Sequence, residues 1–240
     1  MLNNITLENI LFLDIETVPQ QASFDLMNKP AQELWERKAL HLKKEENETA
    51  CDIYNRAGIY AEFGKIICIS VGAFSLQNGM REFRIKSFFG DDEKELLLNF
   101  TQLLNQRYNK PQHLLCGHNG KEFDFPYLSR RMLVNGIKLP EILNTATKKP
   151  WEVQHLDTME LWKFGDYKSY TPLNLLAHIF DIASPKDDID GSMVWKIYWN
   201  EKDLKRIVTY CQKDVITVAQ IILKYRLEPL LNDDEINIVE

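Results

Sequence analysis

Residues 10–17, ILFLDIET, carry an apolar run directly into a pair of acids. An uninterrupted run of this kind is typical of a strand that is buried in a sheet. Asp14 and Glu16 at its end would lie next to low-dielectric material, where an ionised acid is costly unless a positive charge pairs with it. Between Met1 and Lys29 the sequence contains no lysine or arginine. The compensating charge therefore has to come from elsewhere.

Further stretches have the composition of strands that could pair with residues 10–15. KIICISVGAF at residues 65–74 is strongly apolar, and REFRIKSFF at residues 81–89 follows the turn signal QNG. We expect these three strands to form an antiparallel meander. A short apolar strand is expected at residues 113–119 and a weak one at residues 153–159.

Helical patterns occupy much of the remaining chain. A charged helix is expected at residues 31–48, inside an insertion that spans residues 20–62. Asp91 and Asp92 open an amphipathic helix. The later helices are expected at residues 124–134, ending at Asn135-Gly136, at residues 172–180, and at residues 201–225 with Asn200 as N-cap.

The order of these elements predicts an α/β fold, in which a mixed five-stranded sheet is flanked by helices in a three-layer sandwich. No internal repeat and no second core are apparent, so we expect a single domain over residues 1–240. The last stretch, residues 227–240, is acidic, and we expect its end to fray.

Composition limits the classes of function. The 240 residues carry a net charge of −6, whereas a protein that coats nucleic acid nonspecifically is normally basic, so any nucleic-acid contact must come from a local patch. The four cysteines form no CxxC pair, and Cys68, Cys116 and Cys211 lie inside apolar stretches, which suits buried thiols in a reducing cytoplasm. The N-terminus lacks the features of a signal peptide, and no apolar window is long enough for a membrane span. We therefore expect a cytoplasmic protein without a membrane partner.

Three places along the chain combine acids with defined elements. Asp14 and Glu16, two apart on a strand, point to the same face, so their carboxylates converge. Hard divalent cations such as Mg²⁺ prefer such oxygen ligands. The same two acids would also suit a turn before Val18-Pro19.

The second place is Asp124, in the stretch CGHNGKEFDFPYLSRR. It could be the N-cap of the following helix, with Pro126 just inside. A capped helix end can still present a free carboxylate oxygen, so a cap and a metal ligand are compatible.

The third place is Tyr210 and Asp214, in IVTYCQKDVITVAQIIL. The apolar stripe of this helix has a period of 3.6 residues, and Asp214 lies at its edge, with Tyr210 one turn earlier. A solvated acid would more often lie opposite the stripe. The residues alone also allow a tyrosine and an acid that merely flank a core helix.

DIET, HNGKEFDF and YCQKD, in this order, resemble the motifs of the DEDD exonucleases, which have a ribonuclease H-like fold. The last motif is Tyr-x-x-x-Asp, and Thr209 stands where a histidine would be expected, so the chain resembles the tyrosine branch. The closest likeness is to standalone predicted 3′–5′ exonucleases related to the proofreading domains of family B DNA polymerases. GHNGKEFDFPYL and IASPKDDIDGSMV are typical of that group.

The resemblance implies a metal-dependent 3′–5′ exonuclease with two divalent ions, Mg²⁺ or Mn²⁺. Asp14, Glu16, Asp124 and Asp214 would be the metal ligands, with Asp14 bridging both ions. Tyr210, a neutral phenol with an ordinary pKa of ~10, would orient the attacking water. Two ions can clamp an in-line phosphoryl displacement on both sides.

The implied substrate is a single-stranded or frayed DNA 3′ end, with contacts expected at Thr17, Asn119, Lys121 and Phe123. Asp157 is expected to cap a strand end or to support the site rather than to bind metal directly. His118 and His155 are expected to be hydrogen bonded rather than ligands. The local basic supply for phosphates comprises Lys121, Arg130, Arg131, Lys148, Lys149, Lys163 and Lys168.

Other readings stay open at this stage. The sequence does not separate DNA from RNA as substrate, because contacts to a 2′-hydroxyl cannot be recognised in it. A catalytically silent nucleic-acid-binding module on the same fold is the alternative from another class. A polymerase or repair protein would act in trans, since no such module is present in this sequence.

Overall fold

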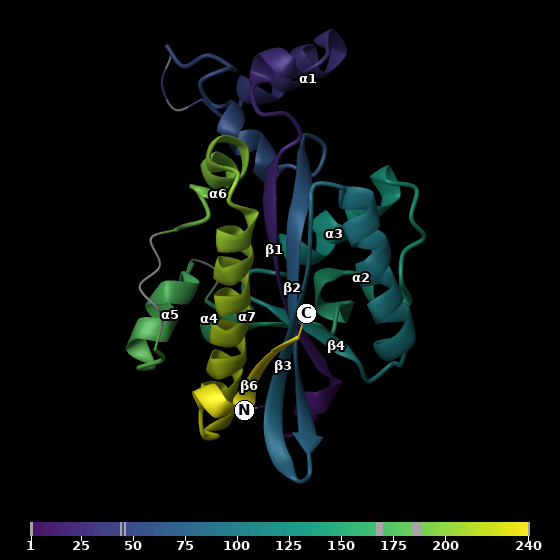
Figure 1. The fold of residues 1–240 in the computed structure, drawn as a ribbon, viewed down its shortest axis with the longest axis vertical. Helices are drawn as coiled ribbons and strands as arrows, with labels where there is room; N and C mark the ends of the chain where they lie inside the picture. Colours follow the sequence, from purple (N-terminus) through teal and green to yellow (C-terminus); the bar gives the residue numbers. More distant parts are fainter. Residues whose placement is uncertain (1, 44, 46, 167–169, 184–188, 240) are drawn as a thin grey trace.

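The computed structural model describes residues 2–43, 45, 47–166, 170–183 and 189–239. Its centre is one mixed sheet of six strands in the order β5-β4-β1-β2-β3-β6 (Figure 1). The strands are β1 (Ile10–Pro19), β2 (Gly64–Gln77), β3 (Met80–Phe89), β4 (Leu114–Gly117), β5 (Leu156–Asp157) and β6 (Ile236–Val239). The expected α/β sandwich with a ribonuclease H-like arrangement is confirmed.

Helices cover both faces of this sheet. In Figure 1, α7 lies with α4, α5 and α6 on one side, and α2 and α3 lie on the other. The helices are α1 (Lys29–Ala39), α2 (Glu93–Arg107), α3 (Asp124–Val134), α4 (Thr158–Lys163), α5 (Leu173–Ile179), α6 (Val194–Lys196) and α7 (Leu204–Arg226). None of the helices in the described ranges combines the length and the apolarity needed to cross a membrane.

The alternation of side chains along β1 divides the core into two parts. Ile10 and Phe12 pack into the cluster that contains the apolar stripe of α7. Leu11 and Leu13 pack into the cluster formed with α2 and α3. Because residues two apart on a strand share a face, Asp14 points toward α7, as Phe12 does.

The expected meander of β1, β2 and β3 is present. β1 pairs antiparallel with β2, and β2 with β3, and a tight turn at Asn78-Gly79 joins the last two strands. Both turn residues have positive φ, 54° and 80°, as a two-residue hairpin turn requires. β4 and β5 then continue the sheet in parallel on the other side of β1.

The strand count was wrong, because the chain end was expected to fray and instead forms β6. This strand pairs in parallel with β3, which would otherwise be a bare sheet edge. Arg81 on β3 holds the segment in place: its guanidinium binds Glu235 at 2.8 Å and donates to the carbonyl oxygens of Pro229 and Leu230.

Two helix boundaries also differ from expectation. The charged helix ends at Ala39 rather than residue 48, and Asn28 caps its start by accepting from the Ala31 N–H. The last helix is capped by Asp203, not by Asn200. Asn200 lies inside a single π-helical segment, Ile197–Glu201, and Lys202 then adopts a left-handed φ of 58°, so the new helix begins after it.

Candidate active site

The acidic end of β1 meets α3 at an open strand edge. β4 pairs with β1 at Ile10, Leu11 and Phe12. Within the described chain, no strand pairs with that edge beyond Phe12. There the Ile15 N–H donates instead to Oδ1 of Asp124, at 3.1 Å. Asp124 is the first residue of α3, and its carboxylate is turned toward β1 rather than used as a cap.

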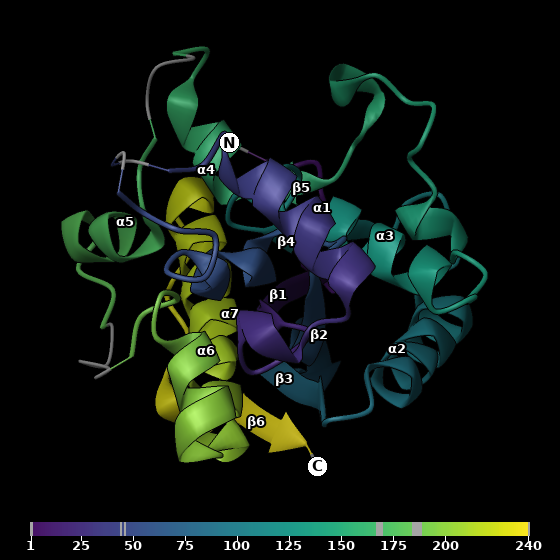
Figure 2. The ribbon, with the colours of Figure 1, turned by 90° about the horizontal axis from the view of Figure 1, so that it is seen from above.

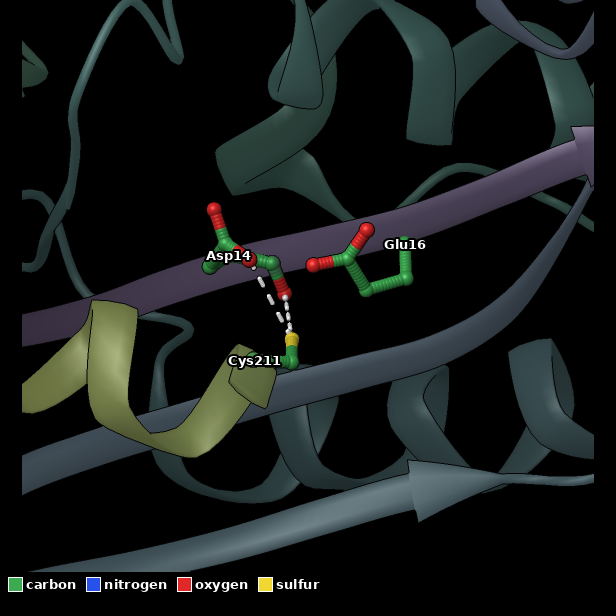
Figure 3. Close-up of side chains that lie close together, drawn as sticks. All are labelled: Asp14, Glu16 and Cys211. Atoms are coloured by element: carbon green, nitrogen blue, oxygen red, sulfur yellow. Dashed lines mark hydrogen bonds between the residues drawn. The ribbon is translucent and has the colours of Figure 1, made fainter. Parts of the chain in front are cut away.

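Helix α7 approaches the same acids from the other side. The Cys211 thiol donates to the carbonyl oxygen and to Oδ2 of Asp14, at 3.4 and 3.2 Å (Figure 3). Ligand atoms of Asp14, Glu16 and Cys211 all lie within 4.8 Å of one another. Cys211 itself was expected only as a buried thiol. Its position one residue after Tyr210, on the apolar stripe, was the signal that it would face β1.

The carboxylates of this site raise one another's pKa values. Burial is the largest cause for Asp14, whose pKa lies well above its usual value, and Asp124, Glu16 and Asp214 raise it further. Burial also raises the pKa of Glu16, again with help from Asp214. The pKa of Asp124 rises to about 7, mainly through burial, although its bond with the Ile15 N–H opposes the shift.

Carboxylates that are poorly solvated and repel one another are expected at a site where a bound cation would neutralise them. Glu16 and Asp124 are 7% and 5% exposed, so water solvates them poorly. Several carboxylates from three separate elements meet there, and oxygen-only donor sets suit hard divalent ions. A bound cation would relieve both the desolvation and the mutual repulsion. The donor chemistry therefore fits the implied metal.

Tyr210 lies beside these acids on α7. Burial raises its pKa, and Asp214, Glu16 and Asp14 raise it further, so the phenol keeps its proton. The phenol is also hydrogen bonded to the Asp214 carboxylate, to which it donates. A neutral phenol at this point has its oxygen lone pairs available to a water molecule.

Two of the expected substrate contacts, Thr17 and Phe123, pack toward α3. The register between β1 and β2 shifts between Glu16 and Thr17. Thr17 hydrogen bonds with the Tyr127 phenol on α3. Phe123 packs its ring 5.3 Å from that of Tyr127. Both side chains are thus engaged with the α3 side of the core.

The other two contacts, Asn119 and Lys121, lie on the loop between β4 and α3. Asn119 has a positive φ of 61°, and its Oδ1 is buried without a hydrogen-bond partner among the described residues. Lys121 forms an ion pair with Glu160 on α4 at 2.7 Å. The loop is held by Asp157, whose carboxylate accepts the backbone N–H groups of both residues, at 3.0 and 3.1 Å.

Asp157 also caps α4, because it accepts the N–H groups of Met159 and Glu160. A strand-end capping role, expected from the sequence, agrees with these bonds. His118 contacts Thr158 and Thr171, and His155 contacts Ile142, so both imidazoles are hydrogen bonded as expected.

Arg131 does not belong to the basic supply for phosphates. Its guanidinium is buried and binds Glu93, at 2.6 and 2.9 Å, and the carbonyl oxygen of Ala61. A side chain 5% exposed and fully engaged in the core cannot reach a nucleic acid. Of the remaining expected cations, Lys168 lies outside the described residues, and Arg130, Lys148 and Lys149 are exposed.

A family model described as a predicted 3′–5′ exonuclease related to the exonuclease domain of PolB matches residues 59–235. The matched stretch contains Asp124, Tyr210 and Asp214 and begins after Asp14 and Glu16. The assignment of the first two acids therefore depends on their position in the fold.

Among solved structures, the chain is similar to the family B DNA polymerase from the hyperthermophilic archaeon Pyrobaculum calidifontis. The TM-score is 0.55 at 17% sequence identity, and the match covers 91% of this chain. It covers 24% of the polymerase, so this chain spans about a quarter of that protein. At this identity the likeness concerns the fold.

Proposed function

Because the chain belongs to the family of predicted 3′–5′ exonucleases related to the exonuclease domain of PolB, we propose that it removes nucleotides from the 3′ end of single-stranded or frayed DNA. The observation that carries this proposal is the convergence of buried and half-buried carboxylates from β1, α3 and α7. Burial and neighbouring acids raise the pKa values of Asp14, Glu16 and Asp124, and such clusters of perturbed carboxylates are typical of functional sites.

Asp14, Glu16, Asp124 and Asp214 would hold two divalent ions, Mg²⁺ or Mn²⁺. When bound, the ions supply positive charge for the attacking and leaving oxygens of the phosphoryl displacement. The protein supplies position: the Ile15 N–H orients the Asp124 carboxylate, and the Cys211 thiol orients that of Asp14.

Tyr210 would position the attacking water. Its phenol donates to Asp214, so the phenol oxygen can accept a hydrogen bond from that water. The water oxygen attacks the terminal phosphorus, and the bond from phosphorus to the 3′ oxygen of the preceding nucleotide breaks. The products are a nucleoside 5′-monophosphate and a strand shortened by one residue, whose new 3′ oxygen takes up a proton.

The decisive experiment follows a 5′-labelled strand over time with Mg²⁺, with Mn²⁺ and with chelator. DNA and RNA strands of one sequence are compared, which also measures the sugar preference. We expect stepwise shortening from the 3′ end, lost with chelator and in Asp14→Asn. The exposed acid Asp52, replaced in Asp52→Asn, is the matched control and should leave the ladder unchanged. A first cut inside the strand would contradict exonuclease action. If neither the DNA nor the RNA strand is cleaved, the catalytically silent nucleic-acid-binding module becomes the favoured function.

A further inference from the structure

A cleft of about 620 Å³ lies beside the proposed active site. Figure 2 shows α4 on one side of β5 and, on the other, the loop between α3 and β5. Residues of both segments line the cleft, together with Asn119 and Lys121 from the loop after β4. The cleft therefore begins at the loop that leads into Asp124.

Two large exposed aromatic residues are adjacent in sequence to residues that line this cleft. Trp151 is 76% exposed and Phe164 is 77% exposed. Each is next in sequence to lining residues, Pro150 for the first, and Lys163 and Gly165 for the second. A single exposed aromatic residue is ordinary on a protein surface, but exposed aromatic faces beside a cleft are the kind of group on which bases stack.

The backbone at Phe164 is in an unusual conformation. Phe164 ends α4 in the left-handed region, with φ 45° and ψ 35°, and Gly165 follows at φ 88°. Bulky residues rarely adopt positive φ, because it costs free energy. The conformation ends α4 beside the cleft and leaves the Phe164 ring in solvent.

Lysines supply positive charge around the two rings. Lys148 and Lys163 line the cleft, and the Lys149 ammonium lies 5.2 Å from the centre of the Trp151 ring. The acids in the lining are partly engaged within the protein. Glu160 is paired with Lys121, and Asp157 accepts four backbone N–H groups. Glu122 and Asp166 also line the cleft, so its charge is mixed rather than strongly basic.

One of the lining residues, Asn119, carries an unmet hydrogen-bond acceptor. The buried Oδ1 of Asn119 has no partner in the described part of the chain. A base amino or imino group is a donor that would satisfy it. From Asn119 the chain turns directly into α3, since the Phe123 N–H donates to the Asn119 carbonyl oxygen, and Asp124 follows. The loop that contributes Asn119 and Lys121 to the cleft thus leads directly into Asp124.

We propose that this cleft is the binding channel for the single strand on the 5′ side of the scissile bond. Its bases stack on Trp151 and Phe164, and its phosphates contact Lys148, Lys149 and Lys163. The assignment of the strand's direction rests on the proposed exonuclease function, because that function places the 3′ end at the carboxylates. Binding of a single strand in the cleft does not require hydrolysis.

Binding is measured by fluorescence anisotropy with a short 5′-fluorescein-labelled oligothymidylate, in an Asp214→Asn background that prevents degradation. Loss of one base–aromatic stack should weaken binding by about 5- to 100-fold in Trp151→Ala and in Phe164→Ala. Trp151→Phe keeps an aromatic ring, so its affinity for the oligothymidylate should stay close to that of the parent protein. Phe89→Ala removes an exposed ring elsewhere, 49% exposed at the end of β3, and should bind as the parent does.

Salt dependence provides a second readout. Three lysine–phosphate contacts on a single strand predict a slope of roughly −2 for the logarithm of the association constant against that of salt concentration. Lys148→Ala combined with Lys163→Ala should bring the slope to roughly −0.7. If Trp151→Ala and Phe164→Ala both bind the strand as tightly as the parent, the proposal is overturned. An unchanged salt dependence in the lysine double variant would also overturn it.

A mononucleotide substrate separates this proposal from the proposed function. The p-nitrophenyl ester of thymidine 5′-monophosphate has no upstream strand, so only the carboxylate site acts on it. In the otherwise wild-type chain, Trp151→Ala and Phe164→Ala should release p-nitrophenolate at rates within about 2-fold of the unmodified protein, because no base–aromatic contact is lost. A large loss with this ester would place the two rings in the catalytic site instead and overturn the channel. If the wild-type chain leaves the ester and all strands intact, the exonuclease function fails, and the anisotropy experiment still decides the channel.

Discussion

The thiol of Cys211 and the Oδ2 atom of Asp14 are 3.2 Å apart, although 197 residues separate them in the chain. Cys211 also donates to the Asp14 carbonyl oxygen, so it binds the strand and the carboxylate together. This bond connects α7 to β1 at the point where the acids converge. It makes Cys211 a residue that orients the Asp14 carboxylate, rather than only a core thiol.

Removing this donor should weaken metal binding. Loss of a hydrogen bond to a ligating carboxylate typically costs 10–100-fold in metal affinity, so Cys211→Ala should bind Mn²⁺ roughly tenfold more weakly. Cys211→Ser keeps a donor and should remain within about 3-fold of the wild type. Isothermal titration calorimetry with Mn²⁺ measures both constants. Equal affinity in the alanine variant would show that the thiol does not orient Asp14.

Asp14→Asn should stabilise the metal-free protein at pH 8 while abolishing hydrolysis. Desolvation and three neighbouring acids raise the pKa of Asp14, so its ionised form costs stability in the folded state. Thermal unfolding in chelator measures the gain, and each kcal/mol corresponds to roughly 2–4 °C in a chain of this size. We expect an increase of a few degrees, and a smaller response to added Mn²⁺ than in the wild type.

The control for this experiment is Asp52→Asn. Asp52 is exposed, and hydrogen bonds from Thr49 lower its pKa, so the change should not raise the melting temperature. A lower melting temperature for Asp14→Asn in chelator would mean that the carboxylate is stabilised by the protein itself and that no cation is needed to hold it.

Tyr210→Phe should lower kcat without loss of metal affinity. The phenol oxygen is the proposed contact to the attacking water, and positioned groups of this kind contribute about 10²–10⁴-fold in general acid–base chemistry. Because Tyr210 is expected to orient rather than to remove a proton, we expect a loss near the lower end of that range. Hydrolysis of the p-nitrophenyl ester and Mn²⁺ calorimetry give the two readouts. Tyr108→Phe, at the end of α2, is the matched control, and equal rates in Tyr210→Phe would exclude the water-positioning role.

His155 should make the protein less stable as the pH falls. Its Nδ1 accepts the Leu115 N–H and its Nε2 contacts the Ile142 carbonyl oxygen, which together require the neutral ring. Burial lowers the pKa of His155 from 6.5 to about 4. The unfolded chain therefore binds more protons between these values, so stability is complete above pH 6.5 and falls toward pH 4, by about 3 kcal/mol.

The measurement is the free energy of unfolding in urea across this range, for the wild type and for His155→Gln in chelator. The difference between the two proteins isolates His155 from the carboxylates, which titrate in the same range. This difference in the free energy of unfolding should become smaller as the pH falls from 6.5 to 4. A difference that stays constant would show that the imidazole is protonated equally in the folded and unfolded states.

Removing one partner of the Arg131–Glu93 pair should destabilise the fold without affecting strand binding. Glu93 also accepts the Ile66 N–H and the Asn135 side chain, so Arg131→Ala would leave a buried acid without its cation. The cost of breaking such a pair is about 3–5 kcal/mol. Urea unfolding measures it, with the exposed neighbour in Glu95→Gln as control, and anisotropy should show the parent's salt slope. A reduced salt dependence of strand binding in Arg131→Ala would show that Arg131 contacts a phosphate after all.

Local sequence patterns were sufficient to predict much of the sheet and the elements on which the acids lie. The apolar run before Asp14 predicted a buried strand, and the 3.6-residue period of α7 placed Asp214 at the margin of its stripe. Both are short-range properties, because side-chain direction on a strand or helix depends on residue spacing alone. The order of DIET, HNGKEFDF and YCQKD indicated the family from the sequence alone.

What the sequence alone determined is therefore which residue types occur on which face of which element. The tertiary structure decided the partners: Ile15 with Asp124 over 109 residues, Cys211 with Asp14 over 197, and Arg131 with Glu93 rather than with phosphate. It also decided that the acidic chain end pairs as β6 and that Pro150 and Lys163, the sequence neighbours of Trp151 and Phe164, line one cleft. Contacts between distant segments depend on how whole elements pack, and the spacing of residues within one element carries no information about that packing.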